Sequence, residues 1–240
     1  MVKSKLFAAA LLLAASSAQA TIATVFEGIP TGSAKFNTTV INAGGTVKTD
    51  IWTDLMGGPV VDRGDYTISR TDGGSVWFGS YGTMSGDVMS IDPYGSSRDA
   101  LGSKVSGITF TFDNPINSFG FEVGDWATCC HEPTTDLYIS FDNGAPILVA
   151  SASQYGDGLF KNRFGDLVHE IFVAAFDDSG SFSKVQFWGN GFGEVLVAGG
   201  MVKYALIDEG SLPPTPGVPA PASAALLGLG LLALRLRKRA

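Results

Sequence analysis

The stretch FEVGDWATCCHEPTTD holds the densest set of chemically active side chains in the sequence. Acids, a histidine and two thiols follow one another without a regular hydrophobic period, which indicates a loop. We therefore predict a binding loop here. Its members are Glu122, Asp125, Trp126, His131 and Glu132, beside the thiols of Cys129 and Cys130.

Cys129 and Cys130 are the only cysteines in the chain. In an oxidising compartment two thiols normally pair, and neighbouring residues join only through a tight, strained ring that makes the loop rigid. The alternatives are free or intermolecular thiols, or zinc bound by both cysteines, His131 and an acid. Adjacent cysteines give poor tetrahedral geometry. We therefore predict a disulfide and no metal in this loop.

Other candidate sites rest on weaker patterns. The sequence has no nucleophile elbow, metalloprotease helix, phosphate-binding loop or EF-hand, and we predict no cofactor. A glycoside hydrolase needs only two acids across a cleft, so Glu122, Glu170 and Glu194 stay candidates. Residues 92–99 could supply oxygen ligands for Ca²⁺ or form a plain loop. The tryptophans would either stack on sugars or fill the core; they are Trp52, Trp77, Trp126 and Trp188.

A β scaffold must position these groups. Apolar and polar residues alternate in GITFTFDNP, SFGFEVGDW and DLYISFD, and LVHEIFVAAF reads as a strand in which His169 is structural. Asp142-Asn143-Gly144 and residues 177–180 indicate hairpin turns. Between the termini no twelve residues have a clean helical period, and 31 glycines oppose helix. We predict an all-β ectodomain over residues 21–211, a single jelly-roll-like β-sandwich of about twelve strands.

The first twenty residues have the features of a signal peptide. Two lysines precede the apolar run LFAAALLLAA, which is too short to span a bilayer stably. Ala18 and Ala20 fit the small-x-small pattern that signal peptidase reads. We expect cleavage after Ala20, so that the exported chain begins at Thr21.

A proline-rich linker at residues 212–221 leads into a hydrophobic tail at residues 218–240. The apolar stretch from 218 to 234 reaches the lower limit for a membrane-spanning helix, and the basic end should stay cytoplasmic. The tail therefore predicts membrane contact, at least transiently, with the domain outside. Its signal residues are Val218, Pro219, Ala220, Pro221, Arg235, Arg237, Lys238 and Arg239.

The order of a Pro-x-Pro signature, an apolar stretch and an arginine-rich end resembles the PEP-CTERM sorting signal of Gram-negative bacteria. This resemblance covers about residues 217–240. It implies two partners, signal peptidase and an exosortase-like membrane protease-transpeptidase that removes the tail from the inner membrane. The family signature reads Pro-Glu-Pro, whereas Ala220 stands in the middle here, so cleavage of the tail stays open. SFGFEVGDW and FWGNGFGE also look like the β-rich ectodomains found before such tails.

The ectodomain is strongly acidic. All 23 acidic residues but only ten of the sixteen Lys and Arg lie within it, a net charge of about −13. This argues against nucleic acid or an anionic membrane surface as partner. We expect a non-catalytic envelope or extracellular-matrix protein that interacts with extracellular polysaccharide or surface proteins. A carbohydrate- or Ca²⁺-dependent binding module would expose aromatics beside acidic loops, and a carboxylate glycoside hydrolase would place two acids across a groove.

Overall fold

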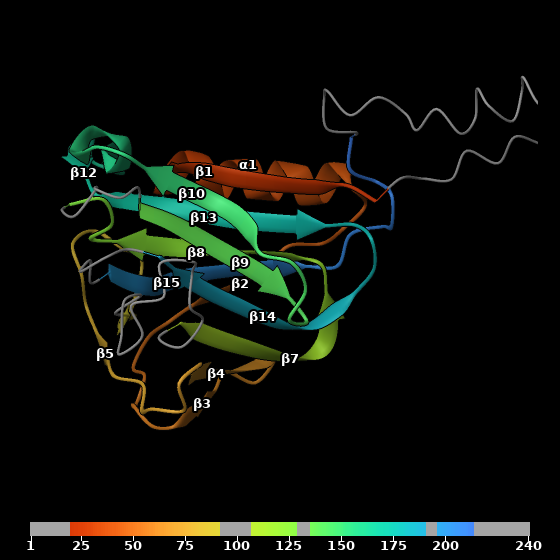
Figure 1. The fold of residues 1–240 in the computed structure, drawn as a ribbon, viewed down its shortest axis with the longest axis horizontal. Helices are drawn as coiled ribbons and strands as arrows, with labels where there is room; N and C mark the ends of the chain where they lie inside the picture. Colours follow the sequence, from red (N-terminus) through yellow and green to blue (C-terminus); the bar gives the residue numbers. More distant parts are fainter. Residues whose placement is uncertain (1–19, 92–106, 129–134, 191–195, 214–240) are drawn as a thin grey trace, which may run out of the picture.

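The computed structural model describes residues 20–91, 107–128, 135–190 and 196–213, which form two antiparallel sheets (Figure 1). The seven-stranded sheet has the order β1 (Ile22–Gly28), β13 (Glu170–Asp177), β8 (Ser118–Gly124), β15 (Leu196–Ala205), β6 (Val88–Ile91) and β5 (Phe78–Gly79), with β2 (Lys48–Ile51) also paired to β15. The six-stranded sheet has the order β10 (Ile147–Ala152), β9 (Thr135–Phe141), β14 (Phe182–Gly189), β7 (Ile108–Ile116), β4 (Tyr66–Arg70) and β3 (Val60–Asp62). A 3-10 turn, η2 (Tyr155–Gly158), precedes a small hairpin of β11 (Phe160–Lys161) and β12 (Leu167–Val168). The prediction of a β-sandwich is confirmed.

The two sheets pack face to face around an aromatic core. Phe110 of β7 lies with its ring centre 4.6 Å from that of Phe119 in β8. Phe121 of β8 is likewise 4.7 Å from Phe187 of β14. The alternation that predicted these strands is therefore the alternation of side chains toward and away from this core.

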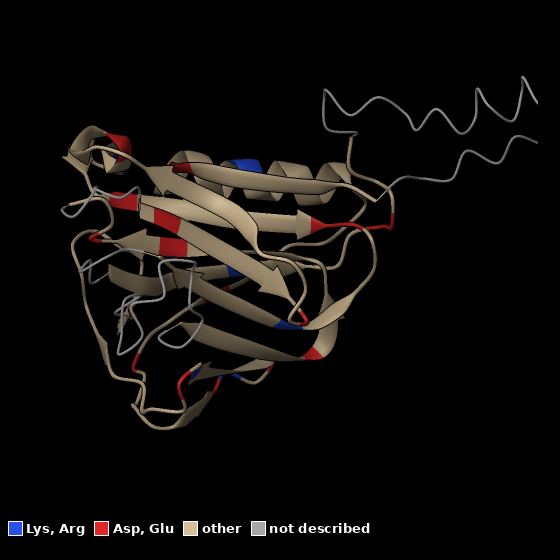
Figure 2. Ribbon diagram, in the orientation of Figure 1, with Lys and Arg blue, Asp and Glu red and all other residues tan. Residues whose placement is uncertain are grey.

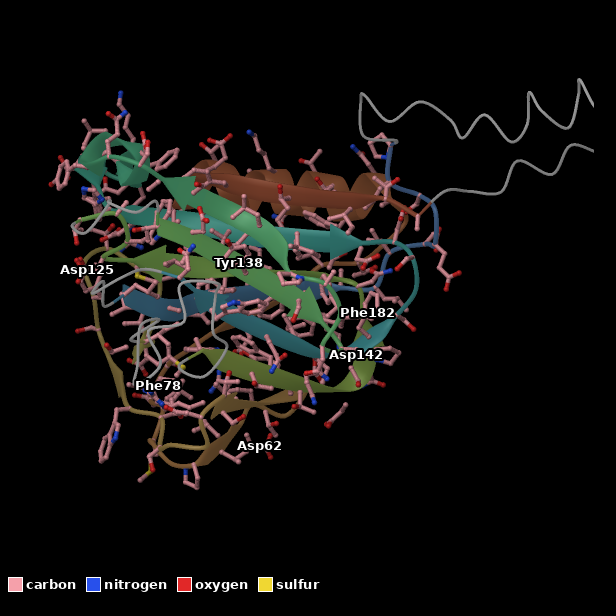
Figure 3. The ribbon with its side chains drawn as sticks, viewed as in Figure 1. Asp62, Phe78, Asp125, Tyr138, Asp142 and Phe182 are labelled. Atoms are coloured by element: carbon pink, nitrogen blue, oxygen red, sulfur yellow. The ribbon has the colours of Figure 1, made fainter. Side chains whose placement is uncertain are left out.

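The two predicted hairpin turns have different outcomes. Asp142-Asn143-Gly144 joins β9 to β10 as predicted, with φ of 45° at Asp142 and 60° at Asn143 (Figure 3). The hairpin predicted at residues 177–180 is wrong, because this turn carries the chain from β13 in one sheet to β14 in the other. β13 lies between β1 and β8, so both of its edges are already hydrogen-bonded and β14 cannot pair beside it.

The prediction that the domain lacks a helix is also wrong. One α-helix, α1 (Ile29–Asn42), covers the outer face of the seven-stranded sheet over β1, β13 and β8 (Figure 1). Phe36 packs against Phe172 and Phe176 of β13, and a Cβ added at Gly32 would lie 2.7 Å from Phe172 Cβ. Tertiary packing therefore stabilises a segment of low helix propensity. No helix in the described ranges is long and apolar enough to cross a membrane.

A bulge at Gly199 and Gly200 divides β15 between two neighbours. The residues before the bulge pair with β6 and those after it pair with β2. Both glycines have positive φ, 133° and 62°, which suits glycine alone at low cost. The Trp52 indole lies against Gly199, and the Trp52 backbone N–H donates to the Gly200 carbonyl at 2.9 Å. The bulge thus fixes where the loop after β2 begins.

Candidate functional site

The predicted binding loop does not form as one exposed unit. Glu122 is a buried residue of strand β8, and Trp126 is 1% exposed with its ring edge-on to Phe26 at 5.4 Å. Only Asp125 lies at a partly exposed turn (Figure 3). The prediction of an exposed loop is wrong for Glu122, which lies in β8 beneath the segment that carries Ser85. Trp126 does lie in the turn after β8, but its side chain packs into the main hydrophobic core. Cys129, Cys130, His131 and Glu132 lie outside the described residues.

Two buried carboxylates fasten the segment at residues 81–86 onto the seven-stranded sheet. Glu122 pairs in register with Phe172, so it shares the outer face with Glu170 two residues earlier on β13. Glu170 accepts the Thr83 N–H at 2.7 Å and also its hydroxyl. Glu122 accepts the Ser85 N–H at 2.7 Å and its hydroxyl at 2.5 Å. The acids sit side by side under this segment rather than across a groove, so the arrangement is that of a structural latch.

This latch gives a pH dependence with a definite sign. Burial raises the pKa of Glu122, and hydrogen bonds from Ser85 and the Met201 N–H oppose that rise. A raised folded pKa means that Glu122 favours folding below its unfolded pKa and loses this contribution as pH rises through the folded value. Relative to Glu122→Gln, we therefore expect the native chain to gain stability from about pH 7 to about pH 4. Urea denaturation of both chains measures the difference.

The control for this change of charge is Glu209→Gln, because Glu209 is an exposed carboxylate. The difference in free energy of unfolding between Glu209→Gln and the native chain should depend less on pH than the difference between Glu122→Gln and the native chain. A Glu122→Gln difference that stays constant, or falls toward acid pH, would contradict a raised pKa for the buried acid.

One tryptophan of the four is exposed. Trp77 is 78% exposed, and a Cβ added at Gly57 would lie 3.6 Å from its ring. Met56, the residue before Gly57, is 85% exposed. We call Met56, Gly57 and Trp77 the Trp77 surface. The sequence signal for the exposure of Trp77 is the pattern VWF. Val76 is buried, and in an extended chain the side chain of the next residue points to the opposite side. The tryptophans of the core are Trp52, Trp126 and Trp188.

Backbone hydrogen bonds hold the two loops that carry the Trp77 surface. Gly58 and Val76 exchange N–H···O bonds of 3.1 and 2.7 Å, which pair the two loops. Leu55 N–H donates to the Asp87 carboxylate at 3.1 Å, so the first loop is also anchored to the segment before β6. Phe78, the residue after Trp77, lies at the lower left of the sandwich in Figure 3. The exposed indole therefore stands on a fixed backbone.

Acidic residues lie in the same two loops. Asp54 is exposed and adopts a positive φ of 53°. Asp72 pairs with Arg70 at 2.9 Å and caps the Gly74 N–H at 2.9 Å. The hydrogen bond from Arg70 lowers the pKa of Asp72, so its carboxylate is ionised at neutral pH. An exposed aromatic beside acidic loops is the feature that distinguishes a binding module among the functions expected from the sequence.

A concave region opens at the opposite end of β2 from Trp52. It is a cleft of about 310 Å³. Lys48 and the Tyr204 hydroxyl each donate to Asp65 Oδ2 at 2.7 Å, and these bonds, that from Lys48 first, lower the pKa of Asp65. Asn114 and Phe112 form part of the wall. These residues are far apart in the sequence, and no local pattern brings them together.

The remaining candidates separate into described and undescribed residues. His169 lies between β12 and β13, so the single strand predicted over LVHEIFVAAF is interrupted there. It is partly buried, with Nδ1 2.9 Å from the Trp126 carbonyl oxygen. Within the described ranges, no group of three or more His, Cys, Asp or Glu is placed to hold a metal ion. Ala20 is exposed and Thr21 is buried. Ala18, residues 92–99, Glu194 and the tail residues 218–240 lie outside the described residues.

No known family matches the sequence, and no curated protein matches it. One solved structure that aligns contains the CBM32-1 and CBM32-2 domains of Clostridium perfringens ZmpB, at 11% identity and a TM-score of 0.23. The alignment covers 79% of this chain and 43% of that one, so this chain spans less than half its length. A TM-score this low does not define a common fold.

Proposed function

We propose that this chain is an exported, non-catalytic protein of the cell envelope or extracellular matrix that binds extracellular polysaccharide through the Trp77 surface. In this proposal the signal peptide exports the chain, a PEP-CTERM-like tail sorts it, and the domain is a jelly-roll-like sandwich. The observation that carries the binding function is the 78% exposure of Trp77 on loops that are themselves held in place.

The chemistry of an indole suits a sugar ring. One face of a pyranose presents C–H groups with partial positive charge, and an aromatic face carries partial negative charge. Stacking the two faces removes apolar area from water on both sides. Because the backbone around Trp77 is already ordered, little conformational entropy is lost on binding. Asp54, an exposed carboxylate in the same loop as Met56 and Gly57, can accept hydrogen bonds from sugar hydroxyls.

The charge of the domain favours a neutral polysaccharide over an anionic one. Acidic positions clearly outnumber basic ones on the ribbon of Figure 2. Like charges repel over roughly 8–10 Å at physiological salt, so a uronic-acid or sulfated chain would approach against this field. We therefore expect binding to neutral glycans and weaker binding to anionic ones.

Hydrolysis is less well supported than binding. The carboxylates of Glu122 and Glu170 are 0% and 3% exposed, and each already accepts two hydrogen bonds from the segment above it. A glycosidase acid must reach the scissile oxygen of its substrate, which neither group can do while the latch is closed. The cleft beside Asp65 is the second candidate binding region, because its volume would admit a sugar unit.

Replacing Trp77 with alanine is expected to weaken polysaccharide binding about tenfold, since an aromatic stack contributes on the order of 1 kcal/mol beyond buried area. The melting temperature should hardly change, because the side chain is exposed. Trp77→Tyr should retain most of the affinity. Affinity electrophoresis through gels containing a soluble neutral glucan, a xylan or alginate measures binding to each glycan.

The matched control is Phe164→Ala, because Phe164 is an aromatic side chain 68% exposed in the loop before β12. It should leave retardation unchanged. Binding that survives Trp77→Ala but is lost in Asn114→Ala would place the sugar in the cleft instead. No retardation of the native chain by any neutral glycan, or release of reducing ends from them, would refute the proposed function.

A further inference from the structure

A single buried carboxylate joins the two ends of the domain. Asp178, directly after β13, is 1% exposed. Its Oδ1 accepts the Thr21 N–H at 2.5 Å, and its Oδ2 accepts the Leu212 N–H at 2.8 Å. The Asp178 backbone adds bonds to the same two segments, from its N–H to the Thr21 carbonyl and from the Gly210 N–H to its own carbonyl. The first and last described segments consequently leave the domain side by side (Figure 1).

Among the residues that the structure describes, no cationic side chain pairs with the charge on this carboxylate. None of the four ion pairs formed among described residues involves Asp178. A carboxylate this deep is costly unless hydrogen bonds and an opposite charge compensate it. In the uncleaved chain its two partners are neutral amides. A positive charge at the Thr21 nitrogen would therefore stabilise the buried Asp178 carboxylate directly.

We propose that Asp178 is a binding site for the α-ammonium group that export processing creates at Thr21. Water adds across the Ala20–Thr21 peptide bond in signal peptidase, which leaves a carboxylate on Ala20 and an amine on Thr21. An α-amino group has a pKa of about 7.7–8.0 in an unfolded chain, so it is mostly protonated at neutral pH. Cleavage thus converts an amide hydrogen bond into a buried ion pair without moving the nitrogen.

The geometry also selects the residue at which the chain must begin. Thr21 is 9% exposed, whereas Ala20 is exposed. A chain with earlier residues would carry its ammonium group away from Asp178, and a chain beginning at Ile22 would leave Asp178 Oδ1 without its Thr21 donor. Leu212, on the other oxygen, is buried and is the first residue of the predicted proline-rich linker. Processing at one terminus therefore strengthens the attachment of the segment that leads to the sorting tail.

The test compares two versions of the protein that differ only in their first residue. One begins at Thr21 and the other at Ala18, and each is made with and without Asp178→Asn. The Thr21 chain should melt roughly 3–8 °C above the Ala18 chain, as a charge-assisted buried hydrogen bond implies. Asp178→Asn should abolish this difference. Asp177→Asn is the matched control, since Asp177 is a neighbouring, partly exposed acid that caps Ser179 N–H, and the difference should persist.

Acetylation of the Thr21 amine provides a second measurement that does not depend on whether Asp178→Asn folds. It keeps the N–H donor and removes the charge, so the acetylated chain should melt like the Ala18 chain. Equal melting temperatures for the Thr21 and Ala18 chains, or a difference that survives in Asp178→Asn, would overturn the proposal. So would an intact mass of the exported protein that begins at any residue other than Thr21. None of these outcomes depends on the Trp77 surface or on polysaccharide binding.

Discussion

Replacing Asn117 with alanine is expected to lower the free energy of unfolding by about 3–5 kcal/mol. Asn117 is fully buried at the turn between β7 and β8. Its amide donates to the Gly180 and Ile207 carbonyls at 3.0 Å each, and its oxygen accepts the Ile207 N–H at 2.8 Å. Alanine would leave all three backbone groups without this partner. Urea denaturation followed by tryptophan fluorescence measures the loss.

Two further variants separate the lost hydrogen bonds from a general effect of truncation. Asn117→Asp keeps the shape but turns an oxygen toward the two carbonyls, so it should destabilise at least as much at neutral pH. Asn190→Ala is the control, because among the described residues the Asn190 side chain bonds to Asp136 alone, and it is less buried. A loss for Asn117→Ala no larger than that for Asn190→Ala would show that the buried amide does not join these segments.

Replacing Trp52 with alanine is expected to cost about 3–5 kcal/mol of stability, as for other large buried aromatics. Trp52 is 0% exposed and lies edge-on to Phe78 at 5.5 Å. Its indole N–H donates to the Tyr66 hydroxyl at 2.8 Å, and Tyr66 donates to Asp50 at 2.7 Å. The variant therefore removes core volume and one end of a polar chain together. Thermal and urea unfolding both measure the effect.

Trp52→Phe retains more of the core packing than Trp52→Ala. It keeps one aromatic ring and loses the N–H donor with part of the ring volume, so it should cost about 1–2 kcal/mol, because the Tyr66 hydroxyl still bonds to Asp50. The comparison with Trp77→Ala is equally informative, since that variant should weaken binding and leave stability nearly unchanged. A Trp52→Ala chain as stable as Trp77→Ala would contradict the placement of Trp52 in the core.

The fold class could be predicted from the sequence because strands have a local signature. The alternation in GITFTFDNP follows from a period of two residues, and it identified β7 and its inward-facing phenylalanines. The sequence also predicted the turn at Asp142-Asn143-Gly144, since these residues tolerate the positive φ found there. The signal peptide and sorting tail rest on sequence patterns as well, and both stay predictions.

Features that depend on contacts between distant residues were decided by the tertiary structure alone. The segment PTGSAKFNTTVIN has weak helix propensity, and it becomes α1 because Phe36 can bury itself against Phe172 and Phe176. Glu122 looked like a loop acid by its neighbours, yet the segment carrying Ser85 covers it.

The candidate sites divide along the same line. The sequence left all four tryptophans open between sugar stacking and the core, and the structure places Trp77 alone of them at the surface. The cleft at Asp65 and the contact of Asp178 with both chain ends join residues far apart in the sequence. Backbone periodicity is a local property that the order of residues records directly. Burial of a given side chain, and the partner of a given charge, depend on which distant segments pack against it.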